Sequence, residues 1–458
     1  MRKFFKFEFI LIYSFILIFV VTNIYINKFS EQYFISGDYK HSSLYQEDVI
    51  SYFKVSDRIS KDIADGKKIY NSGGPYSFSF LHPRVIYFFN NFFNSNEEII
   101  NSATLKIHLK NYNFFLYFQI IFFYLSTLFL HRSLLKIFDK SLSNIICIVL
   151  LLNPIIFQWH LSFYTESIFL SFLILLICFL LRSKSWLHFL FIGLFVGIIY
   201  TQRTIALLYP IVIFSYIFFL NHNFRKKLFK ISSLLIGMSL ILILIGIYNY
   251  NRSGIFYFTP IQSKSDIQTY LEPHVLKMSK KISLEEAHEQ IKDYNLSLID
   301  IHKYDLTNET DKIFYLNKVQ KNSLKTLMSN KIITLKIIMK NYFHSVLLNP
   351  VQVFYEAKYK SWIDYKKSDD HKFWLIVRII ITPIFFIFSG LGIIFSVKKI
   401  DFKLNLFLFL STIYFMGISC WLPNTRYFIP SVLFMSIYLS IALYEINLYM
   451  RKKQAMSI

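Results

Sequence analysis

The sequence predicts an all-α integral membrane protein with about ten transmembrane helices and two large extracytoplasmic loops. Of its 458 residues, 54% are hydrophobic, whereas a soluble domain is usually about 45–50% apolar. These residues gather into runs that approach or reach the roughly 20 residues a helix needs to cross the hydrocarbon core. Basic residues cluster after every second run, as expected for the cytoplasmic loops of a multi-pass membrane protein.

Ten apolar runs are the expected spans. The first follows the basic start Met1-Arg2-Lys3. This run is long and lacks a small-residue cleavage site, so we interpret it as a retained helix and not as a signal peptide. Asn153-Pro154 interrupts the pair of runs over 142–181. The ten runs cover 7–27, 112–131, 142–159, 163–181, 185–201, 204–220, 231–249, 374–396, 404–421 and 428–447.

The basic clusters orient these spans. They precede the first run and follow the second, fourth, sixth, eighth and tenth, while the short loops opposite carry little positive charge beyond Arg203 and Arg426. Because Lys and Arg are enriched in cytoplasmic loops, both termini are expected in the cytoplasm. The N-terminal transmembrane module (1–249) then carries a first outer loop (28–111). An extracytoplasmic, partly interfacial helical region (250–373) and the C-terminal transmembrane helices (374–458) follow.

The formal net charge of +22 would suggest a nucleic-acid partner in a soluble protein. Here Lys and Arg mark cytoplasmic loops and helix ends near anionic headgroups, so membrane lipids are expected partners and nucleic acids are not. The cysteines Cys147, Cys178 and Cys420 show neither a disulfide framework nor a metal-ligand spacing. A glycine-rich phosphate loop is also missing from the sequence.

Acidic residues of the first outer loop are candidates for proton transfer. Asp48 opens an expected amphipathic helix, and a carboxylate there can take a proton from an acceptor hydroxyl. Glu47 and Asp38 are the fallback candidates. A solvated position on a loop is the alternative interpretation for each of the three.

Three further charges lie at the outer ends of spans. Glu166 begins an apolar run, where the helix dipole alone favours a carboxylate, although a charge at the edge of the hydrocarbon is often functional. Arg203 and Arg426 are the lone cations of short outer loops. An aqueous interface would accommodate them, but guanidinium groups also bind phosphate through paired hydrogen bonds.

The order of short motifs resembles the GT-C superfamily of membrane glycosyltransferases, in particular its dolichyl-phosphate-mannose-protein-mannosyltransferase-like and aminoarabinose-transferase-like members. Asp48 and Tyr52 keep the ends of an Asp-Glu-x-x-Tyr motif, with Val49 at its second position. The other similar segments are Gly74-Pro75-Tyr76-Ser77-Phe78 through His82-Pro83, Tyr164-Thr165-Glu166-Ser167, Gln202-Arg203-Thr204, Ser253-Gly254-Ile255-Phe256 and Asn424-Thr425-Arg426-Tyr427-Phe428-Ile429-Pro430.

The resemblance implies an inverting hexosyl- or pentosyltransferase on the outer face of a bacterial inner membrane. It would move a sugar from a polyprenyl-phosphate donor to a lipid, glycan or protein acceptor. A divalent cation is compatible with this chemistry, but the sequence indicates no ligands for one. The implied base is Asp48, Glu47 or Asp38, and the implied substrate-binding residues are Tyr52, His82, Glu166, Arg203, Arg426 and Tyr427.

Two other functions stay open at this point. A polymerase or ligase of lipid-linked polysaccharides is also multi-pass, but it uses a diphosphate donor and does not need the Asp-x-x-x-Tyr loop. A flippase or transporter of lipid-linked sugars places its polar residues near the middle of the bilayer, often in repeats. The charges here gather at the outer helix ends, which argues against transport.

Labelling of introduced cysteines tests the topology. We expect a membrane-impermeant thiol reagent to react in intact cells with cysteines placed at Ser60 and Gln290, and not with cysteines at Lys226 or Ile400, because basic loops stay in the cytoplasm. Permeabilised cells, in which all four positions become accessible, are the control. Reaction at position 226 in intact cells would overturn the orientation and the outer-face location of every candidate residue.

Overall fold

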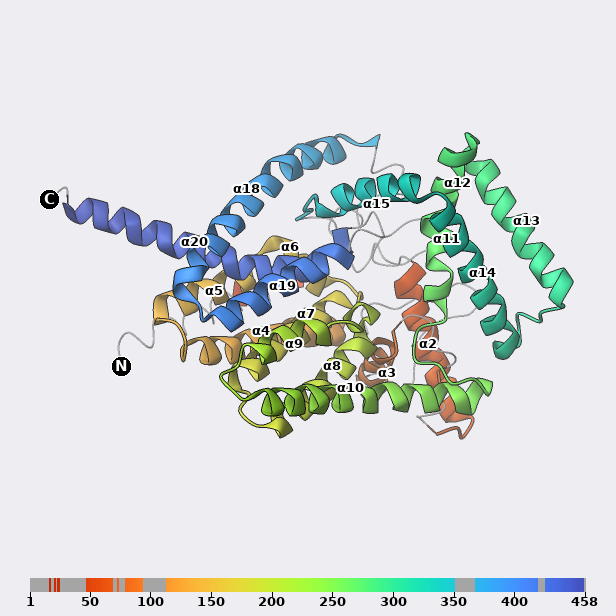
Figure 1. Cartoon of the computed structure of the whole chain (residues 1–458), viewed down its shortest axis with the longest axis horizontal. Helices are drawn as coiled ribbons and strands as arrows, with labels where there is room; N and C mark the ends of the chain where they lie inside the picture. The colour runs from red at the N-terminus through yellow and green to blue at the C-terminus, as the bar shows by residue number, and fades with distance from the viewer. Residues whose placement is uncertain are drawn as a thin grey trace.

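The chain folds into a long helical bundle with a smaller group of helices at one end (Figure 1). The computed structural model describes residues 16–17, 20–21, 23–24, 47–68, 72–73, 79–93, 113–350, 367–418 and 425–456. Within these ranges all regular structure is helical, which confirms the all-α class. We call the smaller group, formed by α11 to α15, the cap. The C-terminus lies at the end of the bundle far from the cap.

The bundle contains the expected apolar runs from residue 112 onward, each as one helix or as a short pair. Its helices are α4 (Asn113–Leu134), α5 (Lys140–Leu152), α6 (Pro154–Phe157), α7 (Glu166–Arg182), α8 (Trp186–Gln202), α9 (Pro210–Phe218), α10 (Phe224–Ser253), α18 (Asp369–Lys399), α19 (Phe402–Ile418) and α20 (Ile429–Met456). The expected first span at 7–27 lies almost wholly outside the described residues.

The described helices indicate a membrane protein, but they do not establish ten spans. Four of them, α4, α10, α18 and α20, are long and apolar enough to cross a membrane, and α5 with α6 forms a bent fifth. The helices α7, α8 and α19 have 17 residues each, and α9 has nine. A crossing takes roughly 17–25 residues, so the first three are at the short end of this range and α9 falls below it.

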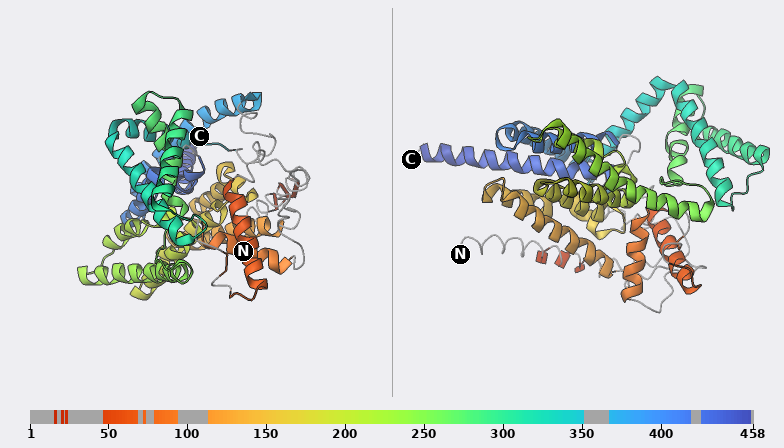
Figure 2. Two further views of the ribbon diagram at one scale, coloured as in Figure 1. Left: turned by 90° about the vertical axis from the view of Figure 1, so that its right-hand side faces the viewer. Right: turned by 60° about the horizontal axis from the view of Figure 1, so that its bottom comes forward.

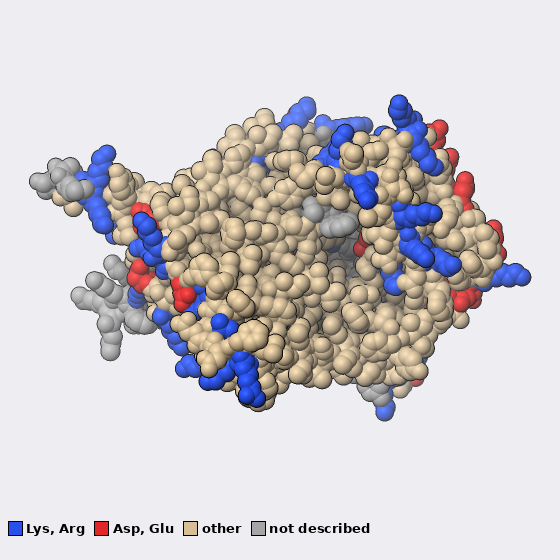
Figure 3. All heavy atoms as spheres, viewed as in Figure 1, with Lys and Arg blue, Asp and Glu red and all other residues tan. Residues whose placement is uncertain are grey.

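The surface agrees with a membrane setting. Figure 3 shows a broad uncharged band over the bundle, with Lys and Arg gathered at its far end and mixed charges over the cap. The helices α7, α18 and α20 carry basic residues in their last turns at that far end. Exposed apolar side chains of the bundle helices include Phe191, Leu244 and Ile387. An apolar outer surface with basic residues at one end is the pattern expected of a helical bundle in a bilayer.

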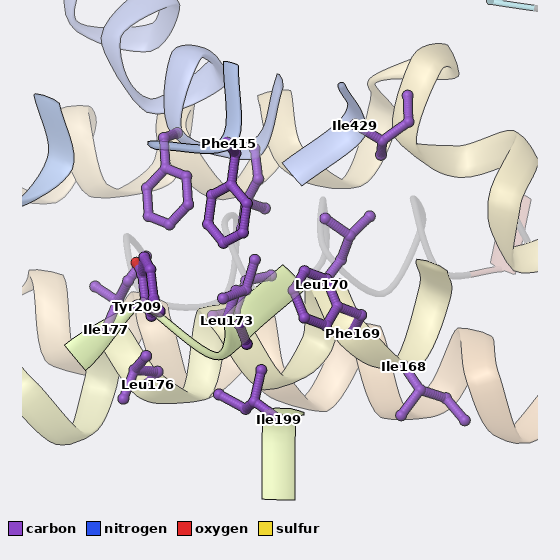
Figure 4. Packing of buried hydrophobic residues seen from close by; sticks show 14 of the residues in the cluster. Ile168, Phe169, Leu170, Leu173, Leu176, Ile177, Ile199, Tyr209, Phe415 and Ile429 are labelled. Atoms are coloured by element: carbon purple, nitrogen blue, oxygen red, sulfur yellow. The ribbon is translucent and has the colours of Figure 1, made fainter. Parts of the chain in front are cut away.

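The core of the bundle forms around α7. Figure 4 shows Phe169, Leu173 and Ile177 of this helix directed toward Tyr209 and Phe415, which come from segments far apart in the chain. All five side chains are buried. Because other helices pack around α7, its first residue is held at the end of the bundle that faces the cap.

A break between α5 and α6 shapes this end of the bundle. The side chain of Asn153 accepts a hydrogen bond from the Ile155 N–H group at 2.9 Å, and Pro154 begins α6. The Asn153 amide also donates to Ser436 Oγ at 2.9 Å. Proline cannot continue a helix because it lacks an N–H group, and the chain bends by 46° here. The bend leads into the buried segment before α7, which includes Tyr164 and Thr165.

Glycines allow a close contact between α8 and α10. A Cβ atom on Gly193 of α8 would lie 2.0 Å from the Leu234 carbonyl oxygen of α10, and one on Gly237 would lie 2.2 Å from the Leu190 carbonyl oxygen. Small residues let the backbones of membrane helices approach in this way. The tight α8–α10 pair fixes the direction in which α8 ends at Gln202.

The cap is an amphipathic helical group connected to the end of α10 (Figure 2). It contains α11 (Asp266–Tyr270), α12 (Glu272–Lys280), α13 (Leu284–His302), α14 (Glu309–Ser329) and α15 (Lys331–Val346). Ser283 caps the start of α13, since its Oγ accepts a hydrogen bond from the Glu286 N–H group at 3.0 Å. The helices α2 (Glu47–Ala64) and α3 (Leu81–Phe93) lie beside it.

Arg252 and Glu309 fasten the cap to the bundle. Arg252 Nη2 lies 3.4 Å from Glu309 Oε2, and the Tyr257 hydroxyl donates to Glu309 Oε1 at 3.0 Å. The Thr310 hydroxyl donates to the Ser253 carbonyl at 2.7 Å. Gly254, with φ of +69°, ends α10. These contacts connect the start of α14 to the last turn of α10.

The close contact between α8 and α10 predicts that adding a single methyl group there lowers the stability of the protein. Gly193→Ala should lower the stability of the purified protein by about 1–3 kcal/mol, the usual cost of overpacking, because its Cβ would clash with the Leu234 carbonyl. Gly390→Ala is the matched control, since a Cβ there meets nothing within 4 Å. Thermal unfolding in detergent measures both. An unchanged midpoint for Gly193→Ala would contradict the described packing.

Candidate functional site

Three segments meet at the cap-facing end of the bundle around the carboxylate of Glu166. This residue begins α7, Arg203 ends α8, and Arg426 belongs to the short helix η9 (Thr425–Tyr427). Arg203 Nη1 donates to Glu166 Oε1 at 2.6 Å, and Arg426 Nε lies 3.0 Å from the same oxygen. The Glu166 side chain is 1% exposed and the two arginines are 6–7% exposed. One buried carboxylate is thus shared by two guanidinium groups.

Aromatic rings enclose both guanidinium groups. The Tyr427 ring centre lies 5.3 Å from Arg203 Cζ and 5.1 Å from Arg426 Cζ, and Tyr164 lies 4.7 Å from Arg426 Cζ. Arg426 Nη2 also donates to the Tyr427 hydroxyl at 3.3 Å. The negative face of an aromatic ring attracts a cation. These rings therefore compensate in part for the loss of water around the two buried arginines.

Arg203 retains hydrogen-bonding capacity. A guanidinium group has five N–H donors in a planar fork, and among the described residues Arg203 has a single hydrogen-bond partner, Glu166. Buried donors normally find partners, and this arginine lines a pocket. Its remaining donors are suited to an anion with several oxygen atoms, such as a phosphate.

The pocket lies between the end of the bundle and the cap, with a cavity volume of about 340 Å³. The bundle contributes Thr165, Gln202, Arg203, Arg426 and Tyr427, and the cap side contributes Gln262, Ser263, Asp266 and Tyr270. Tyr52 of α2 lines it as well. Figure 3 shows the surface hollowed where bundle and cap meet. The pocket thus has one cationic wall and one wall of hydroxyl, amide and carboxyl groups.

His82 of α3 braces the bundle wall from behind. It is fully buried, its Nε2 lies 2.7 Å from the Phe163 carbonyl, and Gln202 Nε2 lies 2.9 Å from its Nδ1. Burial lowers the pKa of His82 to about 4, although the hydrogen bond to the Phe163 carbonyl acts in the opposite direction. The ring is therefore neutral at pH 7, with Nε2 donating to Phe163 and Nδ1 accepting from Gln202. The same Gln202 amide donates to the Thr165 carbonyl at 3.2 Å.

The structure brings most of the sequence-predicted residues together. Tyr52, Arg203, Arg426 and Tyr427 line the pocket. Glu166 and His82 are buried and do not appear in its lining, so their placement indicates support of the wall. For His82, this placement differs from the expected substrate contact.

The three candidate bases are not described at the level of their side chains. Asp38 lies outside the described residues, and Glu47 and Asp48 are described only as the first backbone residues of α2. Their roles stay predictions. Tyr52, one turn further along α2, is buried and its ring packs edge-on against His82 at 5.0 Å.

Sequence reasoning missed the cap side of the pocket. Gln262, Ser263, Asp266 and Tyr270 belong to short helical turns within a polar stretch, and nothing in their spacing distinguishes them from solvated residues. Only the tertiary contact between cap and bundle brings them to the pocket. In the described part of the chain, no group of three His, Cys, Asp or Glu side chains could hold a metal ion.

Removal of the shared carboxylate should be costly. Glu166→Gln leaves two buried arginines without this partner, and breaking a buried ion pair costs about 3–5 kcal/mol. Asp369→Asn is the control, because its partner Lys372 and Asp369 itself are both exposed, and an exposed pair contributes about 1 kcal/mol or less. Thermal unfolding in detergent measures both variants. Equal midpoints for the two would show that Glu166 does not stabilise the cluster.

No protein-family model matches the chain, and no curated protein matches its sequence. Among solved structures, it is similar to the oligosaccharyltransferase AglB from Archaeoglobus fulgidus in complex with an inhibitory peptide and a dolichol-phosphate. The TM-score is 0.48 at 12% identity, over 97% of this chain and 52% of that chain. The same archaeal enzyme tethered with an acceptor peptide gives 0.49 at 14% identity, over 97% and 51%. The chain thus spans about half the length of the archaeal enzyme.

A second similar structure is ArnT from Cupriavidus metallidurans bound to undecaprenyl phosphate. The TM-score is 0.38 at 10% identity, over 93% of this chain and 76% of that chain. At identities this low, the similarity carries no residue roles over to this chain.

Proposed function

We propose that this protein is an inverting membrane glycosyltransferase that takes a hexosyl or pentosyl group from a polyprenyl-phosphate donor. The proposal rests on the pair of buried arginines, Arg203 and Arg426, held on one carboxylate at the wall of a pocket. Planar guanidinium forks match phosphate oxygens. The site lies at the end of an apolar bundle, where a lipid carrier would present its phosphate.

The location of the site favours a lipid-linked donor. A polyprenyl chain stays in the bilayer, so it delivers its sugar along the membrane plane to the end of a helical bundle. The aromatic rings around Arg203 and Arg426 and their low exposure reduce the local dielectric constant, and a charged hydrogen bond is stronger there than in water. A bound phosphate would therefore be held firmly against this wall.

The reaction follows from this placement. An acceptor hydroxyl oxygen attacks the anomeric carbon, the bond from that carbon to the phosphate oxygen breaks, and the lipid phosphate leaves with the electron pair. Arg203 and Arg426 stabilise the negative charge that develops on the leaving phosphate. The hydroxyl proton passes to a carboxylate base, and a single displacement inverts the anomeric configuration.

Asp48 is the proposed base, with Glu47 and Asp38 as alternatives. Residues four apart in a helix share a face, and Tyr52, four residues after Asp48, lines the pocket. Glu166 orients the two arginines, and His82 and Gln202 hold the backbone directly before Glu166 through the Phe163 and Thr165 carbonyls. These three residues act through their neighbours and are positioning residues in this scheme.

The acceptor is proposed to be a lipid, glycan or protein hydroxyl at the outer face of a bacterial inner membrane, with both termini in the cytoplasm. The orientation rests on the basic helix ends at the far side of the bundle. A polymerase or ligase would instead require a diphosphate-linked donor. A flippase would move donor across vesicles that contain no acceptor, which separates it from both enzymes.

Purified protein should transfer sugar from a polyprenyl monophosphate and not from a nucleotide sugar. Arg426→Ala should lose most activity, of the order of 10²–10³-fold, as expected for the loss of a charge-stabilising donor. The activity of Arg426→Lys should lie between those of the wild type and Arg426→Ala, because lysine keeps the charge and loses the planar fork. Product formation from radiolabelled donor measures the activity of the wild type and of both variants. Efficient transfer from a soluble nucleotide sugar without a lipid carrier would refute the proposed function.

The same sugar-transfer assay tests which carboxylate is the general base. Asp48→Asn should lower the rate by about 10²–10⁴-fold, the usual contribution of a general base, with unchanged amounts of protein in the membrane. If Asp48→Asn stays active and Glu47→Gln or Asp38→Asn is inactive, the base is reassigned and the chemistry is kept. Full activity in all three variants would contradict the proposed enzyme function.

A further inference from the structure

An apolar stripe runs along the outer face of α15. Ile332, Leu335, Met339 and Phe343 are all exposed, with Ile332 at 73% and Phe343 at 64%. At about 100° per residue, these four side chains occupy about 80° of the helix circumference. The buried residues Ile337, Asn341 and Ser345 lie on the opposite face. The stripe is therefore directed away from the cap interior, where Ile337 packs with Leu271, Val275 and Leu327.

Lysines border this stripe on both sides. Lys336 and Lys340 follow one edge and Lys331 follows the other, and all three are exposed. An apolar stripe bordered by basic residues is the arrangement of helices that lie at the surface of anionic bilayers, with apolar side chains among the acyl chains and lysines at the headgroups. A face in contact with water alone would not carry four large apolar side chains in register.

The end of α15 is fastened at the depth of the membrane boundary. Arg378 Nη2 of α18 donates to the Leu347 carbonyl at 2.8 Å, and the Leu348 N–H group donates to Thr382 Oγ1 at 3.0 Å. About 20 residues cross the hydrocarbon core, and counting back by that number from Lys398 in the last turn of α18 reaches Arg378. The chain directly after α15 therefore meets α18 near the outer boundary of the apolar layer.

The lipid-facing surface continues from α18 to α15. Phe373, Ile376 and Ile380 of α18 are each more than half exposed, and Figure 1 places α15 next to α18, between the bundle and the outer cap helices. The helix α15 also contacts η9, which carries Arg426. The stripe thus lies on a helix that neighbours exposed apolar side chains of α18 and the candidate site.

We propose that the α15 stripe docks into the headgroup layer of an anionic bilayer and holds the cap over the pocket at that depth. The occupant of this face is the membrane that surrounds the bundle, because the chain after α15 is attached to the membrane helix α18 and the lysines complement anionic phospholipid. The docking does not depend on the reaction, and it would apply to any ligand of the pocket.

Lipid-borne quenchers test the docking without an activity assay. A small fluorescent amino acid is placed at Met339, or at Ile301 of α13 as the control, which is 71% exposed and belongs to another cap helix. Each protein is reconstituted as a single copy in nanodiscs of phosphatidylglycerol and phosphatidylcholine, with or without headgroup-proximal doxyl lipid. We expect about a twofold or greater loss of emission at 339 and little at 301, as for interfacial burial.

Charge reversal separates lipid docking from contact between two copies of the chain. Lys336→Glu with Lys340→Glu should restore much of the emission at 339 in anionic discs, whereas Lys292→Glu on α13 should not, because only the former pair borders the stripe. Two results would overturn the proposal. One is equal quenching by doxyl lipid at positions 339 and 301. The other is emission at 339 that doxyl lipid does not change and that changes only when larger discs hold a second copy of the chain.

Discussion

The shared Glu166 carboxylate is the interaction on which this end of the molecule depends. Two guanidinium groups in a low-dielectric setting repel each other, so Arg203 and Arg426 are held close together only because one carboxylate lies between them at 2.6 and 3.0 Å. The contact joins the start of α7, the end of α8 and the helix η9. It makes these three chain segments into one rigid wall.

The rest of the fold keeps that wall in place. The bend after Asn153 turns the chain so that the segment before α7 is buried at the end of the bundle. The glycine contact between α8 and α10 fixes the line along which α8 approaches. His82 and Gln202 then connect α3 to the Phe163 and Thr165 carbonyls. The last of these contacts acts on backbone directly before Glu166, and the other two fix the helices that carry Glu166 and Arg203.

Much of this arrangement could be predicted from residue chemistry alone. Charges are expensive in an apolar context, so Glu166, Arg203 and Arg426 were visible as exceptions at helix ends, and the structure brings these three into one cluster. The apolar runs predicted the helices because length and hydropathy are local properties. The ten spans stay a prediction, since α7, α8 and α19 have 17 residues each.

The cap side of the pocket could not be predicted, because its position depends on tertiary contacts. Asp266 and Ser263 reach the pocket because the chain after α10 is held to the bundle, where Asn249 Nδ2 donates to the Tyr257 carbonyl and the Tyr200 hydroxyl donates to the Phe258 carbonyl. The burial of His82 is likewise a result of packing between α3 and the bundle, whereas its sequence context suggested a polar residue near substrate. Local patterns do not record which elements meet.

Equilibrium binding of a short-chain polyprenyl monophosphate without sugar isolates phosphate recognition by the arginine cluster from the chemistry of transfer. We expect Arg203→Gln to weaken the affinity of the purified protein by about tenfold or more, since a hydrogen bond to a charged group contributes about 1.5–3 kcal/mol. Lys292→Gln, on an exposed cap helix, should bind like the wild type. Equal affinities of wild type and Arg203→Gln would contradict the assignment of this buried arginine cluster as the phosphate site.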